Sequence, residues 1–227
     1  MCGRFIQVSD PEKIKVMISE LEISPEVRSG FVPRYNIAPT QNILTVLNTP
    51  VPELVYTRWG LIPFWAKDPA IGQKMINARA ETLAEKSSFR TPLRRKRCII
   101  VSDGFYEWRS TGRAKTPFLV RLKSSEPFGL AGLWDQWADP GTGGKIVSST
   151  IITTEPNELV SEIHNRMPAI LRPQHYETWL DPRETRDDAI KGCILSYPSE
   201  EMAAFEVSRL VNNPSYDAPD CVAPLWS

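Results

Sequence analysis

Apolar residues follow a helical spacing near the start of the chain. Four of them between residues 14 and 21 recur at this spacing, which predicts an amphipathic helix over residues 10–23. Ser9 and Glu12 are spaced as a capping box that would begin this helix. Residues 24–40 are rich in proline, carry aromatic and apolar side chains and have no periodicity, so we expect a long ordered loop there.

Runs rich in β-branched and aromatic residues predict strands through most of the remaining chain. Residues 42–47 and 53–59 are predicted to pair as a hairpin. The apolar run 98–101 predicts a strand buried on both faces, which would continue to Trp108. Further strands are predicted at 117–122, 128–134, 148–154, 169–171 and 205–211, and helical segments at about 83–89, 155–163 and 173–180.

The order of these elements predicts a fold class. The chain has no internal repeat, low-complexity tract or linker. We therefore expect one α+β domain over residues 1–227, with a mainly antiparallel, barrel-like sheet flanked by short helices. Its tail would begin at about residue 212.

Composition narrows the class of protein. Hydrophobic residues make up 41% of the 227 positions and charged residues 24%, which is typical of a soluble globular protein. The 27 basic and 27 acidic residues balance, so binding to nucleic acid would need a local patch. No apolar run of about 18 residues and no signal peptide is recognisable. We expect a cytoplasmic, monomeric protein with no membrane association.

Cys2, Cys98, Cys193 and Cys221 are widely spaced and form no C-x-x-C pair. This spacing indicates neither a structural zinc site nor a disulfide framework. We expect reduced thiols, no metal and no organic cofactor.

Cys2 is the residue with the most specific chemistry. Because it follows the initiator methionine, removal of Met1 would leave an N-terminal cysteine. Its α-amine has an ordinary pKa of about 7.7 to 8.0 and its thiol one of about 8.5, so both are partly available as nucleophiles at neutral pH. The amine can condense with an aldehyde to an imine, and the thiol can then close a five-membered thiazolidine ring. The alternative is an ordinary residue on a frayed terminus.

Four further polar residues are candidates. Glu107 lies in an apolar strand, where period two would place it on the face of Phe105, and Gly104 would form a bulge that re-aims it. Such a carboxylate faces solvent or occupies a pocket that raises its pKa. His164 ends a predicted helix whose dipole favours the protonated imidazole, although a lone histidine is more often structural. Asn77 and Arg79 flank an alanine and would point the same way, towards a hydroxyl or a phosphate.

Two segments allow two interpretations each. Trp59 and Trp65 lie in an aromatic loop that is either a plug of the core or a stacking platform for bases. The basic run 94–97 is either a solvated face or a phosphate contact.

Five separated motifs carry a resemblance to a known family. They are Met1-Cys2-Gly3-Arg4-Phe5, Arg34-Tyr35-Asn36-Ile37-Ala38-Pro39, Ile76-Asn77-Ala78-Arg79-Ala80-Glu81-Thr82, Gly104-Phe105-Tyr106-Glu107-Trp108 and Ile163-His164-Asn165-Arg166-Met167-Pro168. In this order, from residue 2 to about residue 211, the chain resembles the SRAP (SOS response-associated peptidase) family of abasic-site-shielding proteins. The lack of a C-terminal extension with a clamp-binding motif is similar to the bacterial members.

The resemblance implies a function and a set of roles. Family members bind single-stranded DNA and capture the ring-opened aldehyde of an abasic site as a thiazolidine on the N-terminal cysteine, here Cys2. It implies that Asn77 contacts the opened sugar, Glu107 acts as acid and base, and His164 assists imine formation and reversal. By the same resemblance, Arg4, Arg79 and Arg166 would hold phosphates, and Pro39, Trp65 and Trp108 would wedge or stack against bases. The protein would join the nucleoid when bound to damaged DNA.

Two other functions stay open on the sequence. Cys2, His164 and Glu107 could form the nucleophile, base and orienting group of a cysteine peptidase. Alternatively, tryptophans and arginines could make a non-covalent module for single-stranded DNA.

Overall fold

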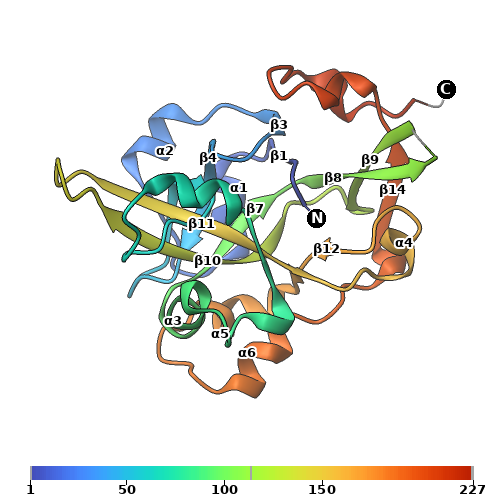
Figure 1. Cartoon of the computed structure of the whole chain (residues 1–227). Coiled ribbons are helices and arrows are strands. Elements are labelled where there is room, and N and C mark those ends of the chain that lie inside the picture. The colour runs from blue at the N-terminus through green and yellow to red at the C-terminus, as the bar shows by residue number, and fades with distance from the viewer. Residues whose placement is uncertain (1, 113, 226–227) are drawn as a thin grey trace.

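Two β-sheets carry the fold, and short helices cover them (Figure 1). The computed structural model describes residues 2–112 and 114–225. The expected α+β class with a mainly antiparallel, barrel-like sheet is confirmed. The larger sheet has nine strands. These are β2 (Glu22–Ile23), β4 (Asn42–Leu47), β5 (Glu53–Trp59), β6 (Asn77–Arg79), β7 (Arg97–Ser102), β10 (Phe128–Ala138), β11 (Lys145–Thr154), β12 (Met167–Pro168) and β13 (Ile170–Leu171).

Five strands of the larger sheet close into a ring. Antiparallel pairing runs from β11 through β10, β7 and β4 to β5. A short parallel pairing then joins β5 back to β11, at Arg58 with Ser148 and Trp59 with Ser149. Closure gives each of these five strands a hydrogen-bonded neighbour on both sides, which protects them from pairing with other chains.

The two faces of the barrel strands contribute to two different cores. In β7, Ile99 and Val101 pack with the residues of the helices, whereas Cys98 and Ile100 pack in a second core that also contains Cys2. The predicted strand at 98–101 is therefore confirmed as buried on both faces. This alternation follows from the period of two along a strand.

The smaller sheet contains the N-terminal strand. Its five strands, in spatial order, are β14 (Met202–Glu206), β9 (Ala114–Leu122), β8 (Gly104–Thr111), β1 (Phe5–Gln7) and β3 (Arg34–Ile37). Phe5 of β1 pairs with Phe105 of β8, and this register brings the start of the chain to the middle of the molecule (Figure 1).

Helices fill the space around the sheets. In Figure 1, α3, α5 and α6 gather on one side of β10. None of the helices in residues 2–112 and 114–225 is long and apolar enough to cross a membrane. The helices are α1 (Pro11–Met17), α2 (Pro25–Gly30), η1 (Pro69–Lys74), η2 (Ala80–Thr82), α3 (Ser87–Arg95), α4 (Glu158–Ser161), η3 (Pro173–His175), α5 (Tyr176–Leu180), α6 (Asp187–Cys193), η4 (Ser199–Glu201), η5 (Arg209–Asn212) and η6 (Pro219–Val222).

The N-terminal predictions need correction. The helix predicted over 10–23 ends at Met17, because the chain turns to add β2 beside β5. Its cap is Asp10 rather than Ser9, whose hydroxyl instead donates to Asp103. The loop predicted over 24–40 contains α2 and β3.

Four later predictions also need correction. The continuous strand 98–108 is broken at Asp103, whose carboxylate accepts from the backbone of Val8 and Ser9, so that its halves join different sheets. Gly104 pairs regularly with Ile6 and forms no bulge in that pairing. The helix predicted over 155–163 is the four-residue α4, capped by Asn157 rather than Thr154. The last strand ends at Glu206 and is followed by η5.

Arg97 is a structural residue within the basic run. It is fully buried, and its guanidinium donates to five backbone carbonyls. The acceptors are Trp179, Leu93, Arg94, Asp181 and Glu184. The run is therefore divided, with Arg97 fastening α3 and the segment after α5 to the barrel, while Arg94 and Arg95 lie in the last turn of α3.

Replacing Arg97 should destabilise the fold. We expect Arg97→Ala to lower the free energy of unfolding by about 3 to 5 kcal/mol, because it leaves buried carbonyls without donors and opens a cavity. Urea unfolding checks this. Arg183→Ala is the matched control, since its side chain is 89% exposed and its loss should leave the free energy unchanged. Equal stability of the two variants would contradict the role of Arg97.

Candidate active site

Cys2 lies just before β1 and is fully buried in the second core. Its carbonyl accepts a 2.8 Å hydrogen bond from the side-chain amide of Asn77. Asn77 is held there because β6 runs parallel to β11, with Asn77 beside Ile151. Residues 77–79 form an extended strand, and the side chain of Asn77 fixes the position of Cys2.

Glu107 is the buried carboxylate of the site, with 2% of its surface exposed. Period two along β8 places Phe105 in the core of Cys2, and Tyr106 and Trp108 in another core, as predicted. Burial raises the pKa of Glu107 above its ordinary value of 4.5. Burial, and next the negative charge of Glu107, raise the pKa of the Cys2 thiol well above its usual range. The two groups thus disfavour carrying negative charge together.

His164 reaches this pair from the segment after α4. Its Nε2 lies 4.0 Å from Oε2 of Glu107. Its Nδ1 lies 3.0 Å from the backbone N of Arg166 and 3.2 Å from the backbone O. The backbone of Arg166 can therefore donate to a neutral imidazole or accept from a protonated one. The predicted helix ends at Ser161, three residues before His164, although the His164 N–H still donates to the carbonyl of Val160.

Arg79 and Arg166 lie on either side of the end of β11. Arg79 pairs with Thr153 and is exposed. The Nη2 of Arg166 donates to the carbonyl of Thr153 at 2.7 Å, and the guanidinium makes a two-bond ion pair with Glu81 at 2.6 and 3.0 Å. Arg166 holds the pKa of the Glu81 carboxyl below its ordinary value. Two arginines thus border one end of the site.

Arg4 and Trp108 form a second border. The Arg4 guanidinium donates to Asn36 and to the carbonyl of Val211, each at 2.7 Å. It also lies 5.9 Å from the centre of the Trp108 ring, whose indole N–H donates to Asn212. Burial lowers the pKa of Arg4. Arg4 therefore has a structural role in addition to any contact with a ligand.

Trp65 and Pro39 lie in turns. Trp65 is 48% exposed, on a loop that begins at Gly60. A side chain at Gly60 would come within 2.5 Å of the Gly72 carbonyl, and its φ is +121°, so only glycine fits. Pro39 precedes Thr40, whose N–H donates to the carbonyl of Trp59. Trp59 itself is fully buried, which answers the earlier alternative: Trp59 belongs to the core and Trp65 to the surface.

Three of the predicted site residues contain a buried polar atom without a hydrogen-bond partner in the part of the chain that the structure describes. These atoms are Nε of Arg4, Oδ1 of Asn77 and Nε of Arg166. Such atoms are uncommon in folded proteins, because each costs about 1 to 3 kcal/mol. One of them, Oδ1 of Asn77, belongs to the side chain that binds the Cys2 carbonyl, where it is available to a polar ligand.

Known proteins resemble this chain over most of its length. The family described as SOS response associated peptidase (SRAP) matches residues 1–214. The chain belongs to the SRAP family. It is 47% identical to the abasic site processing protein YoqW of Bacillus subtilis, over 98% of this chain and 99% of that protein.

Two further matches are more distant in sequence. The abasic site processing protein HMCES of Gallus gallus is 38% identical over 76% of this chain and 57% of that protein. A crystal structure of a protein from Bacteroides thetaiotaomicron superimposes with a TM-score of 0.89 at 29% identity, covering 99% of this chain and all of the other.

Glu81 is the site residue that sequence reasoning missed. It belongs to a quoted motif, and period two after Asn77 and Arg79 would have placed it on their side of the chain. Its place in the site follows from its ion pair with Arg166, which no local pattern indicates because Arg166 is distant in sequence. Among the described residues, no group of three or more histidines, cysteines or acidic residues could hold a metal ion.

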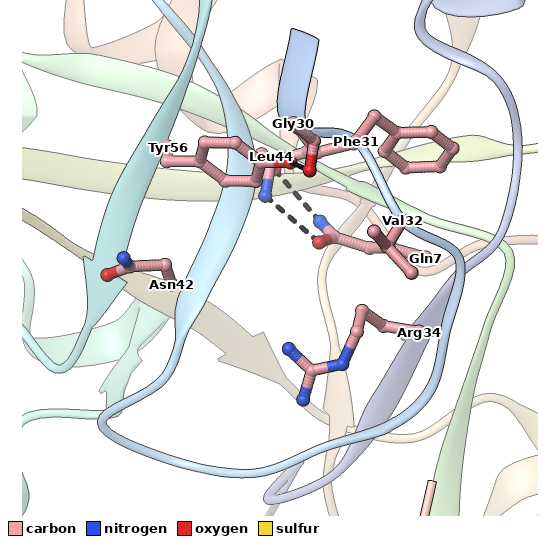
Figure 2. A pocket seen from close by; sticks show the side chains of 8 residues that line it. All are labelled: Gln7, Gly30, Phe31, Val32, Arg34, Asn42, Leu44 and Tyr56. Atoms are coloured by element: carbon pink, nitrogen blue, oxygen red, sulfur yellow. Dashed lines mark hydrogen bonds between the residues drawn. The ribbon is translucent and has the colours of Figure 1, made fainter. Parts of the chain in front are cut away.

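A separate pocket of about 280 Å³ lies at the other end of β1 (Figure 2). At its floor, the Gln7 amide exchanges two hydrogen bonds with the backbone of Leu44. Arg34 on its wall is paired with Asp217 and donates to Gln41. Because these polar groups are already bonded within the chain, we place the functional site at Cys2. The pocket is lined by Gln7, Gly30, Phe31, Val32, Arg34, Asn42, Leu44 and Tyr56.

The raised pKa of Glu107 has a consequence for stability. The folded protein keeps a proton on Glu107 at pH values where the unfolded chain has lost it, so this group makes stability fall as pH rises from about 4.5 to the raised pKa. Glu107→Gln removes the effect. We expect the stability of the variant relative to the wild type to increase as pH rises above about 4.5.

Urea unfolding of both proteins across this range measures the difference. A difference in free energy that is constant with pH would contradict the raised pKa.

Proposed function

We propose that the protein captures abasic sites in single-stranded DNA as a covalent thiazolidine on Cys2, after removal of Met1. SRAP relatives named abasic site processing proteins support a role on abasic DNA. The observation that carries the proposal is the convergence of Asn77, Glu107 and His164 on a buried residue 2. Met1 itself lies outside the described residues.

The reaction balances with loss of one water. The α-amine of Cys2 adds to the aldehyde carbon of the ring-opened sugar, and the carbonyl oxygen leaves as water to give an imine. The thiol then adds across the C=N bond, forming a C–S bond and returning a proton to nitrogen. No oxidant, reductant or further reactant is needed. Holding amine and thiol on one residue makes the second step intramolecular, which can raise its rate greatly.

Glu107 and His164 would move the protons. A carboxyl whose pKa is raised can donate to the departing oxygen and accept the thiol proton near neutral pH. His164 Nε2, 4.0 Å away, could exchange a proton with it after a small movement. Asn77 would orient the residue through its bond to the Cys2 carbonyl and offer its second amide atom, Oδ1, to a sugar hydroxyl.

The borders of the site would hold the DNA backbone and bases. We assign phosphate contacts to Arg4, Arg79 and Arg166, and base contacts to Pro39, Trp65 and Trp108. The exposure of Trp65 supports a stacking role. Because the chain has no net charge, this local group of arginines would supply the electrostatic attraction, and binding should weaken with salt.

The cysteine peptidase alternative has less support. A thiol nucleophile for peptide hydrolysis needs a lowered pKa, whereas burial and Glu107 raise that of Cys2. His164 Nε2 is directed towards Glu107. The non-covalent alternative is tested by the experiment below. We also propose that residues 1–227 form one SRAP domain that acts as a cytoplasmic monomer and joins the nucleoid on damaged DNA.

Cys2→Ala should abolish the covalent adduct while sparing binding, because arginines and aromatic rings supply the affinity. The wild type and the variant are incubated with a single-stranded oligonucleotide carrying one abasic site, or with its intact counterpart. Denaturing gels and intact-mass analysis follow. We expect a lesion-dependent species with the mass of the protein without Met1 plus DNA minus one water.

An adduct in Cys2→Ala would contradict the choice of nucleophile. Equal protection of abasic DNA from cleavage by both proteins would favour the non-covalent module.

An uncleaved N-terminal extension should block the reaction, because it converts the reactive amine of residue 2 to an amide. The control is the same extension joined through a protease site, tested before and after cleavage that leaves Cys2 first. Full crosslinking by the uncleaved protein would exclude ring formation at Cys2.

A further inference from the structure

Arg166 is held from two directions by groups of the protein. Its guanidinium binds both oxygens of Glu81 and the carbonyl of Thr153. Its side chain is only 15% exposed, whereas that of Glu81 is 48% exposed. A two-bond pair between a guanidinium and a carboxylate fixes direction as well as distance. The position of Arg166 is therefore determined by η2 on one side and β11 on the other.

The backbone of the same residue fixes His164. The N–H of Arg166 lies 3.0 Å from Nδ1 of His164, nearer than the carbonyl oxygen of Arg166 at 3.2 Å. The shorter contact favours the neutral tautomer that accepts at Nδ1 and carries its proton on Nε2. That Nε2 is the atom nearest Glu107, at 4.0 Å. A continuous path thus runs from the Glu81 carboxylate through Arg166 and His164 to the buried acid beside Cys2.

We propose that Glu81 is a positioning residue of the crosslinking site, which holds Arg166 and thereby keeps the protonated Nε2 of His164 directed towards Glu107. This inference rests on the proposed function for its effect on rate. Its structural part concerns the DNA-free protein and can be tested without any reaction.

Glu81 also occupies the position of an anion beside Arg79 and Arg166. A carboxylate that accepts two parallel N–H bonds presents the same acceptor pattern as a phosphate. A DNA phosphate would therefore meet an Arg166 whose charge is already partly neutralised. The ion pair with Glu81 weakens the binding of Arg166 to a DNA phosphate but fixes the position of the Arg166 side chain. Binding and rate should therefore respond to removal of Glu81 in opposite directions, with tighter DNA binding and slower crosslinking.

Glu81→Gln tests this, with Glu85→Gln as the matched control. Glu85 is an exposed acid four residues later, and it forms no ion pair within the described part of the chain. Both variants lose one negative charge from the same segment. We measure the dissociation constant for intact single-stranded DNA and the crosslinking rate constant at saturating abasic DNA.

In Glu81→Gln, we expect DNA affinity to become up to about threefold tighter, and the crosslinking rate constant to fall about tenfold. Glu85→Gln should keep the wild-type rate. A parallel loss of affinity and rate in Glu81→Gln, or no change in rate, would overturn the proposal.

The imidazole ¹⁵N spectrum of the DNA-free protein provides the second measurement. The chain has only two histidines, so His164→Gln assigns both signals. We expect the Nε2–H tautomer for His164 in the wild type and in Glu85→Gln, and a mixture of tautomers in Glu81→Gln. An unchanged tautomer in Glu81→Gln would overturn the positioning role. If the wild type forms no adduct, the proposed function fails, and this spectrum alone decides the role of Glu81.

Discussion

The arrangement of the site depends on the backbone hydrogen bonds of β11. Buried N–H and C=O groups must be paired, and β11 meets this requirement with different partners along its length. At Ser148 and Ser149 it pairs with β5 and closes the barrel. From Ile151 to Thr153 it pairs with β6, and at Thr153 and Thr154 with β12. The closure of the barrel and the positions of Asn77, Arg79 and Arg166 are therefore consequences of one strand.

Burial gives the site its chemistry as well as its stability. A carboxyl and a thiol in the same water-poor core cannot both ionise, because each negative charge would lack solvent and repel the other. Glu107 and Cys2 are consequently biased towards neutral, proton-bearing forms. Under the proposed function, such groups would exchange protons with the aldehyde without first releasing ions into solvent. The unfavourable burial of Glu107 is offset by the apolar residues packed around it.

The extent to which the sequence predicted this structure depended on the range of the interactions. The hairpin of β4 and β5 follows from local periodicity and was predicted correctly. The same holds for the two faces of β8, which place Phe105 and Tyr106 in different cores. Asp103 was misread because its partners, Val8 and Ser9, lie about a hundred residues away. Arg97 resembled part of a solvated basic run, since nothing local indicates its three distant carbonyl acceptors, at Trp179, Asp181 and Glu184. Glu81 was overlooked for the same reason, because its partner Arg166 is distant in sequence.

The complete burial of Cys2 implies an order of events during synthesis. The residues that enclose it extend to Glu107 in β8 and beyond, so residue 2 stays accessible until about half of the chain has been made. At typical translation speeds of roughly 5 to 20 residues per second, this interval lasts on the order of 5 to 20 s. Under the proposed function, this interval is when processing enzymes can reach the chain before residue 2 is enclosed. Translation speed and N-terminal processing would then together determine what fraction of the molecules is competent to react.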